Sequence, residues 1–115
     1  MIRITGDDGK SAEFALDGRE EWGDVRILFS FGLGWMSGKV RGSCSGNRIS
    51  ELAEAVRSLA GGAQQDVSFI NDDGNIEFSL KLKPTGRVEL AALAIPDMAG
   101  EDRASFSFEG ILSMD

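Results

Sequence analysis

Residues 48–60 read RISELAEAVRSLA, and their apolar members recur at the spacing of one face of an α-helix. Asn47 or Ser50 can cap the first turn, and the two glycines that follow can end the helix in left-handed geometry. The stretch therefore predicts one amphipathic helix. Its apolar face comprises Ile49, Leu52, Ala53, Val56, Leu59 and Ala60.

After the helix, apolar and polar residues alternate, which is the period of a β-strand. The pentapeptide 71–75, NDDGN, separates two alternating runs and predicts a hairpin. Thr85-Gly86 predicts a second turn, and residues 96–102 a longer connection. Four consecutive strands that pair as neighbours form a meander. We expect them near residues 67–69, 76–82, 88–95 and 105–108.

The part of the chain before the helix has the same strand period. An opening hairpin is expected from residues 1–5 and 12–16, with turn residues between them. Residues 25–31 are dense in apolar side chains, as in a central strand, and residues 39–44 suit a return strand.

These patterns predict one α+β domain over residues 1–115. It is an antiparallel sheet, a meander of about seven or eight strands, with one amphipathic helix packed on one face. A parallel βαβ arrangement is disfavoured because the hairpins give antiparallel pairs and there is a single helix.

The composition limits the kinds of catalytic and metal-binding sites that the chain can form. The 115 residues include no histidine, no tyrosine and one cysteine. This removes histidine-dependent catalysis and metal sites, so we expect no enzyme, no catalytic residues, no metal and no cofactor. The net charge of −7 repels phosphate backbones and anionic lipids, so neither nucleic acid nor membrane is an expected partner. A lone cysteine and no signal-like apolar run favour the cytoplasm.

Three motifs partly match known functional sites. Gly42-x-Cys44-x-Gly46 has the layout of a nucleophile elbow, but no histidine is present to act as base, so Cys44 is expected as a small buried residue. The glycines from 32 to 38 fail as a phosphate loop and instead suit a corner where Trp35 folds over the core. Turn chemistry explains Asp72-Asp73-Gly74 better than calcium binding does.

The acidic segment around Trp22 leaves two interpretations open. Glu20, Glu21 and Asp24 flank the tryptophan. One interpretation is a solvated loop with Trp22 packed into the core. The other is a protein-binding edge, where tryptophan is enriched as an anchor.

The order of these elements resembles the small WapI-type immunity proteins of bacterial toxin systems over roughly residues 25–112. The resemblance rests on Ile49-x-x-Leu52-x-x-x-Val56-x-x-Leu59, Val67-x-Phe69, Asn75-x-Glu77-x-Ser79-x-Lys81, Gly86-Arg87-Val88-x-Leu90 and Ser105-Phe106-x-Phe108. It implies a non-enzymatic antidote that binds a toxin domain, and an acidic chain suits a basic toxin. The residues expected to bind such a partner are Glu20, Glu21, Trp22, Asp24 and Trp35.

Two alternatives remain. One is a homodimeric subunit that pairs through an exposed strand edge. A small-ligand domain would need an apolar cavity of about 300 Å³ or more between helix and sheet.

Overall fold

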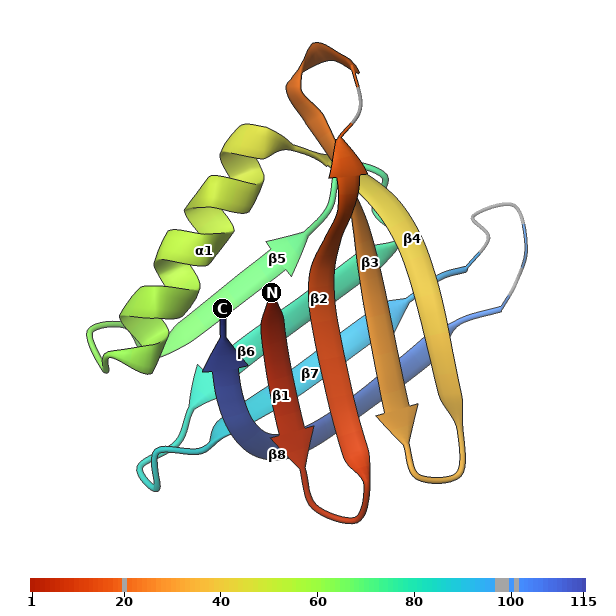
Figure 1. Ribbon diagram of the computed structural model, residues 1–115. Helices are drawn as coiled ribbons and strands as arrows, with labels where there is room; N and C mark the ends of the chain where they lie inside the picture. The colour runs from red at the N-terminus through yellow and green to blue at the C-terminus, as the bar shows by residue number, and fades with distance from the viewer. Residues whose placement is uncertain (20, 97–99, 101) are drawn as a thin grey trace.

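The computed structural model describes residues 1–19, 21–96, 100 and 102–115 (Figure 1). The expected α+β class, with one antiparallel sheet and one helix, is confirmed. In chain order the elements are β1 (Ile2–Gly6), β2 (Lys10–Arg19), the 3₁₀ turn η1 (Glu21–Gly23), β3 (Asp24–Leu33), β4 (Ser37–Ser45), α1 (Gly46–Ala60), β5 (Asp66–Ile70), β6 (Ile76–Leu82), β7 (Val88–Ala94) and β8 (Ala104–Met114).

The strands form a single sheet in the order β4-β3-β2-β1-β8-β7-β6-β5, and all neighbours are antiparallel. The expected meander is confirmed as β5–β8, and the opening hairpin as β1–β2. The pairing of β1 with β8 joins the two halves of the sheet. It also brings the chain ends together, since the Met1 amino group donates to the Asp115 carbonyl oxygen at 2.8 Å.

Strand β8 belongs to both halves because it changes partner at Gly110. Its first part pairs with β7 up to Gly110, and its last part, from Gly110 to Met114, pairs with β1. Figure 1 shows the strong curvature of β8 where this change occurs. The sequence prediction ended this strand at residue 108, which is wrong by six residues, since Met114 is its last residue.

The curvature folds the sheet so that β2 and β3 face β5, β6 and β8. The contacts between these two layers are largely aromatic. The Phe14 ring lies 5.4 Å from the Phe69 ring, and the Phe29 ring lies 6.1 Å from the Phe78 ring. The rings of Phe31 and Phe106 approach to 4.8 Å. Such pairs each contribute about 0.5–1.5 kcal/mol beyond their buried area.

Helix α1 connects the two edge strands, β4 and β5, and lies beside β5 (Figure 1). Its buried side chains are Leu52, Val56 and Leu59, all on the predicted apolar face, whereas Ala60, also predicted on that face, is exposed. The helix begins two residues before the expected start, with Ser45 in the extended N-cap position, so the expected cap at Asn47 or Ser50 is wrong.

Candidate partner-binding site

Trp22 lies at the tip of the turn between β2 and β3, and its side chain is 95% exposed. The interpretation in which it packs into the core is therefore wrong. Its backbone is left-handed, with φ 65° and ψ 23°. Bulky residues rarely adopt this conformation, because their Cβ crowds the following carbonyl oxygen. The turn thus presents a large apolar side chain to solvent on a strained backbone.

The other residues predicted around Trp22 are only partly described. Asp24 is the first residue of β3 and pairs with Ser45, which places it beside the start of α1. Glu20 lies outside the described residues, and of Glu21 the structure describes the backbone alone. The carbonyl oxygen of Gly23 also lies against α1, because a Cβ added at Gly46 would be 3.0 Å from it. The turn therefore lies at the positive end of the helix dipole.

Trp22→Gly tests the strain at this turn. We expect the free energy of unfolding to stay the same or to rise by up to about 1 kcal/mol, because glycine accepts a positive φ and the exposed indole contributes almost no burial. Trp35→Gly is the matched control, since Trp35 has no positive φ; its stability should fall by about 0.5–1 kcal/mol. Urea unfolding of both variants is the measurement, and a larger loss for Trp22→Gly than for Trp35→Gly would contradict the strain argument.

Trp35 lies in the turn between β3 and β4 and is 84% exposed, so the expectation that it folds over the core is wrong. The turn is closed by a hydrogen bond from the Leu33 amide to the Met36 carbonyl oxygen, 2.7 Å long. Leu33 and Met36 pack against the core in place of the tryptophan. Gly34 has φ 89°, and this left-handed residue turns the chain so that the indole points outward.

The two tryptophans do not form one site. They flank β3, whose ten residues span about 33 Å. The turn that carries Trp35 instead lies near the β1–β2 turn, because a Cβ at Gly34 would be 3.4 Å from the Asp8 carbonyl oxygen. Sequence reasoning missed this neighbour because only the pairing of Lys10 with Leu33 brings the two turns together.

Cys44 is fully buried near the end of β4, as expected of a small apolar residue. Its thiol donates a long hydrogen bond, 3.8 Å, to Oδ1 of Asp72. Burial raises the pKa of the Cys44 thiol, and the negative charge of Asp72 raises it further. Because the thiolate is the reactive form, this environment makes Cys44 a poor nucleophile.

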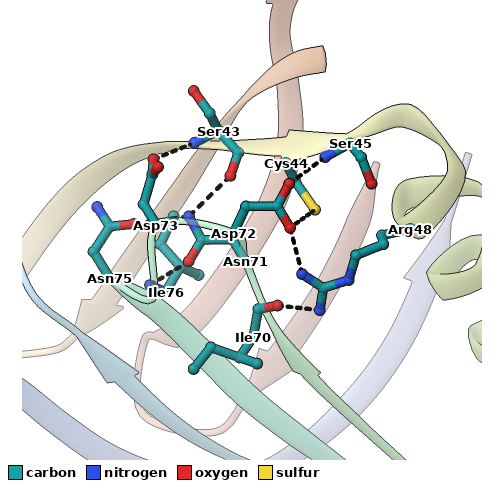
Figure 2. Close-up of polar contacts among 10 residues, drawn as sticks. All are labelled: Ser43, Cys44, Ser45, Arg48, Ile70, Asn71, Asp72, Asp73, Asn75 and Ile76. Atoms are coloured by element: carbon teal, nitrogen blue, oxygen red, sulfur yellow. Dashed lines mark hydrogen bonds and ion pairs between the residues drawn. The ribbon is translucent and has the colours of Figure 1, made fainter. Parts of the chain in front are cut away.

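The turn between β5 and β6 docks onto the edge of β4, where it forms a cluster that we call the edge latch (Figure 2). The latch consists of Asn71, Asp72, Asp73 and Asn75 together with the backbone of residues 41–45. Carboxylate oxygens of Asp73 and Asp72 accept the amides of Ser43 and Ser45 at 2.8 and 2.9 Å. Two outward-facing donors of an edge strand are satisfied in this way, without a neighbouring strand.

The two asparagines of the latch are buried, and their side-chain amide groups both donate and accept hydrogen bonds. The Asn75 side chain donates to the carbonyl oxygen of Arg41 at 2.8 Å. The Asn71 side chain donates to Asn75 Oδ1 at 2.8 Å and accepts the Ile76 amide at 3.0 Å. Gly42 makes room for them, because a Cβ there would lie 2.4 Å from Nδ2 of Asn71.

Arg48 links the latch to the helix. Its Nη1 donates to Asp72 Oδ1 at 2.6 Å, its Nη2 donates to the Ile70 carbonyl oxygen, and its guanidinium carbon lies 5.5 Å from the centre of the Phe69 ring. The hydrogen bond from Arg48 lowers the pKa of Asp72, and the Ser45 amide acts in the same direction.

Asp72→Asn tests this ion pair through acid unfolding. A lowered pKa in the folded state means that the ionised carboxylate stabilises the fold above about pH 4, the usual range of an aspartate. This stabilisation is lost as the pH falls through the folded-state pKa. Stability should therefore fall less steeply in Asp72→Asn than in the wild type below pH 4, as urea midpoints would show. Asp66→Asn on the same hairpin is the control, and equal pH dependence in both variants would contradict the assignment.

No cluster suited to a metal is present among the described residues. The two latch aspartates are committed to backbone amides and to Arg48. Residues 71–75 thus form a turn, as predicted. Their side chains also bind the backbone of β4, about 30 residues earlier in the chain.

The surface hollows are open rather than enclosed. The largest, about 410 Å³, lies along β5, β6 and β7 and includes Arg48 and Glu77 in its lining. A second, about 290 Å³, lies over β1–β4, and a third, about 230 Å³, lies between α1 and β5. The hollow between α1 and β5 is smaller than the cavity of about 300 Å³ that the small-ligand alternative requires.

No family model, curated protein or solved structure matches the chain. Within the described residues, no helix combines the length and the apolar character needed to cross a membrane.

Proposed function

We propose that this chain is a non-enzymatic binding protein, an immunity-like inhibitor that binds and neutralises a basic bacterial toxin domain in the cytosol. The observation that carries the proposal is Trp22, an almost fully exposed tryptophan on a left-handed backbone. The same turn with glycine in place of Trp22 would be less strained, so stability alone does not account for a tryptophan there.

The charge of the molecule supports the same proposal. A net charge of −7 speeds association with a basic partner through electrostatic steering. Trp22 lies in an acidic segment that includes Glu20, Glu21 and Asp24. Aromatic anchors of this kind dominate binding energy when a partner buries them. The resemblance to WapI-type immunity proteins fits this assignment.

The absence of turnover is part of the proposal. Cys44 is the only thiol of the chain, and it is buried with a raised pKa. Histidine is missing from the sequence. Such a chain can bind a partner through an exposed aromatic residue and surplus negative charge. Acid–base or nucleophilic catalysis most often uses a histidine or a reactive thiol, which it does not offer.

The test begins with the reading frame directly upstream of the gene. The proposal expects it to encode a large secreted protein with a variable C-terminal domain. That domain, produced in a bacterial host, should arrest growth, and co-production of the wild-type chain should restore it. A housekeeping neighbour, or a domain that leaves growth unaffected, would contradict the immunity assignment.

Trp22→Ala then tests the surface. Binding to the toxin domain should weaken by about 2 kcal/mol or more, roughly 30-fold, and growth should no longer be restored. Trp35→Ala is the matched control, because it removes the other exposed indole at the far end of β3. A loss below about 1 kcal/mol for Trp22→Ala would place the interface elsewhere.

A further inference from the structure

The N-terminal half of β4 presents an open strand edge. β4 is one of the two edge strands of the sheet, and the latch bonds show that the amides of residues 43 and 45 and the carbonyl of Arg41 point away from β3. Backbone groups alternate in direction along an antiparallel strand, so Ser37 and Lys39 point the same way. Among the described residues, no hydrogen bond reaches the backbone of these two residues from the open side.

The edge is therefore divided into two parts at Arg41. From Arg41 to Ser45, carboxylates and amides of the latch satisfy its outward groups. From Ser37 to the Arg41 amide, donors and acceptors continue in the same line without such a cover, whereas the Arg41 carbonyl oxygen already accepts from Asn75. An edge of this kind is a template for an added strand.

The charges on the open part decide which strand fits. Lys39 and Arg41 lie two residues apart on the outer face of β4. Lys39 is exposed and forms no ion pair among the described residues, whereas Arg41 pairs with Asp17 at 3.0 Å. A second copy of β4, centred antiparallel on this segment, would set Lys39 opposite Lys39. Like charges directly opposite are destabilising, so self-pairing is disfavoured and an acidic strand is favoured.

A hollow and an aromatic side chain border the same segment. The hollow of about 290 Å³ reaches the edge at Ser37, Gly38 and Lys39. Its remaining lining includes hydroxyls from Ser11 and Ser30 and the ion pair between Arg3 and Glu13, 2.6 Å apart. Trp35 precedes the open segment by two residues and is exposed. An added strand would thus find the Lys39 ammonium, two hydroxyls and the Arg3–Glu13 ion pair along its side, and an indole at one end.

We propose that residues 37–41 of β4 form a strand-addition site for an extended acidic segment of a protein partner, with Trp35 as its apolar anchor. The latch offers an internal parallel, because the carboxylates of Asp72 and Asp73 already bind the next amides of the same edge. The inference does not depend on the toxin assignment, since it uses the opposite end of β3 and a partner of opposite charge.

The probe is a synthetic seven-residue peptide of alternating glutamate and valine, with blocked termini, titrated into the full chain labelled with ¹⁵N. We expect backbone amide shifts at Ser37, Lys39 and Arg41 and a shift of the Trp35 indole. Hydrogen exchange at the Lys39 and Arg41 amides should slow when the peptide is bound. A peptide with lysine in place of glutamate should bind at least tenfold more weakly.

Two variants separate backbone pairing from charge. Lys39→Glu keeps the amide and reverses the charge, and it should weaken binding of the acidic peptide at least tenfold. Lys81→Glu is the matched control, because Lys81 is an exposed lysine on β6, an interior strand, and binding should stay within twofold. Lys39→Pro removes an amide that faces away from β3, so the sheet should persist while binding is lost.

Several outcomes would overturn the proposal. They are equal affinities for Lys39→Glu and Lys81→Glu, shifts confined to β5 or to the Trp22 turn, and no shifts at peptide concentrations of about 1 mM. Protection of the Lys39 amide that depends on protein concentration alone would assign the edge to a second copy of the chain. Trp22→Ala should leave peptide binding unchanged, so failure here and failure of the toxin assignment are distinguishable.

Discussion

Gly110→Ala is expected to lower the free energy of unfolding by about 4 kcal/mol, a large share of the 5–15 kcal/mol typical of a domain. A Cβ at this position would lie 2.4 Å from the Thr5 carbonyl oxygen and 2.9 Å from the Gly6 amide nitrogen. Both atoms belong to the backbone of β1, so no side chain can move aside to relieve the clash. The strands must separate at the point where β8 joins the two halves of the sheet.

Gly32→Ala is the matched control for this substitution. Gly32 also lies in a strand of the same sheet, but a Cβ there would meet only the Ser11 hydroxyl, at 3.7 Å. Its stability should change by less than about 1 kcal/mol. Urea unfolding gives both values, and circular dichroism shows whether Gly110→Ala folds at all. Equal stabilities of the two variants would mean that β1 and β8 tolerate a wider separation than their pairing indicates.

Asn71→Ala is expected to cost about 3 kcal/mol, because it removes one side chain that serves several buried partners. The Ile76 amide loses its acceptor, and Asn75 Oδ1 loses a donor. Each buried polar group left without a partner costs about 1–3 kcal/mol. The turn should then release the edge of β4, and a thiol reagent should reach Cys44 faster.

Asn47→Ala is the control for the latch, since Asn47 is exposed in the first turn of α1 and removes the same atoms from an unburied site. Its stability should remain within about 0.5 kcal/mol of the wild type. Stability is measured by urea unfolding and latch opening by the rate of thiol labelling. If both variants label at the wild-type rate, the latch does not control access to Cys44.

Periodicity was enough to predict the local elements of the fold. The 3.6-residue period identified α1, and the two-residue period with turn residues identified the meander β5–β8. The last part of β8 was missed because Ile111 places a large apolar side chain on the outer face beside Leu112 on the inner face. That pair disturbs the alternation from which a strand is predicted.

Contacts between segments that are far apart in the chain could not be predicted from periodicity. The segment 71–75 was correctly predicted as a turn, but nothing in its five residues indicates that its side chains bind β4, about 30 residues earlier. Core packing was expected for Trp22 in one interpretation and for Trp35, but both are exposed, and their exposure depends on left-handed residues, Trp22 itself and Gly34. Backbone angles of this kind follow from the assembled sheet rather than from a residue's hydrophobicity.

The pairing of β1 with β8 also has a kinetic consequence. It joins Ile2 to Met114, so the register at the centre of the sheet links residues separated by nearly the whole chain. Loops of this length are entropically costly to close, and proteins rich in such contacts fold on the millisecond to second scale. We therefore expect the encounter of the two meanders, rather than hairpin formation within each, to limit the folding rate.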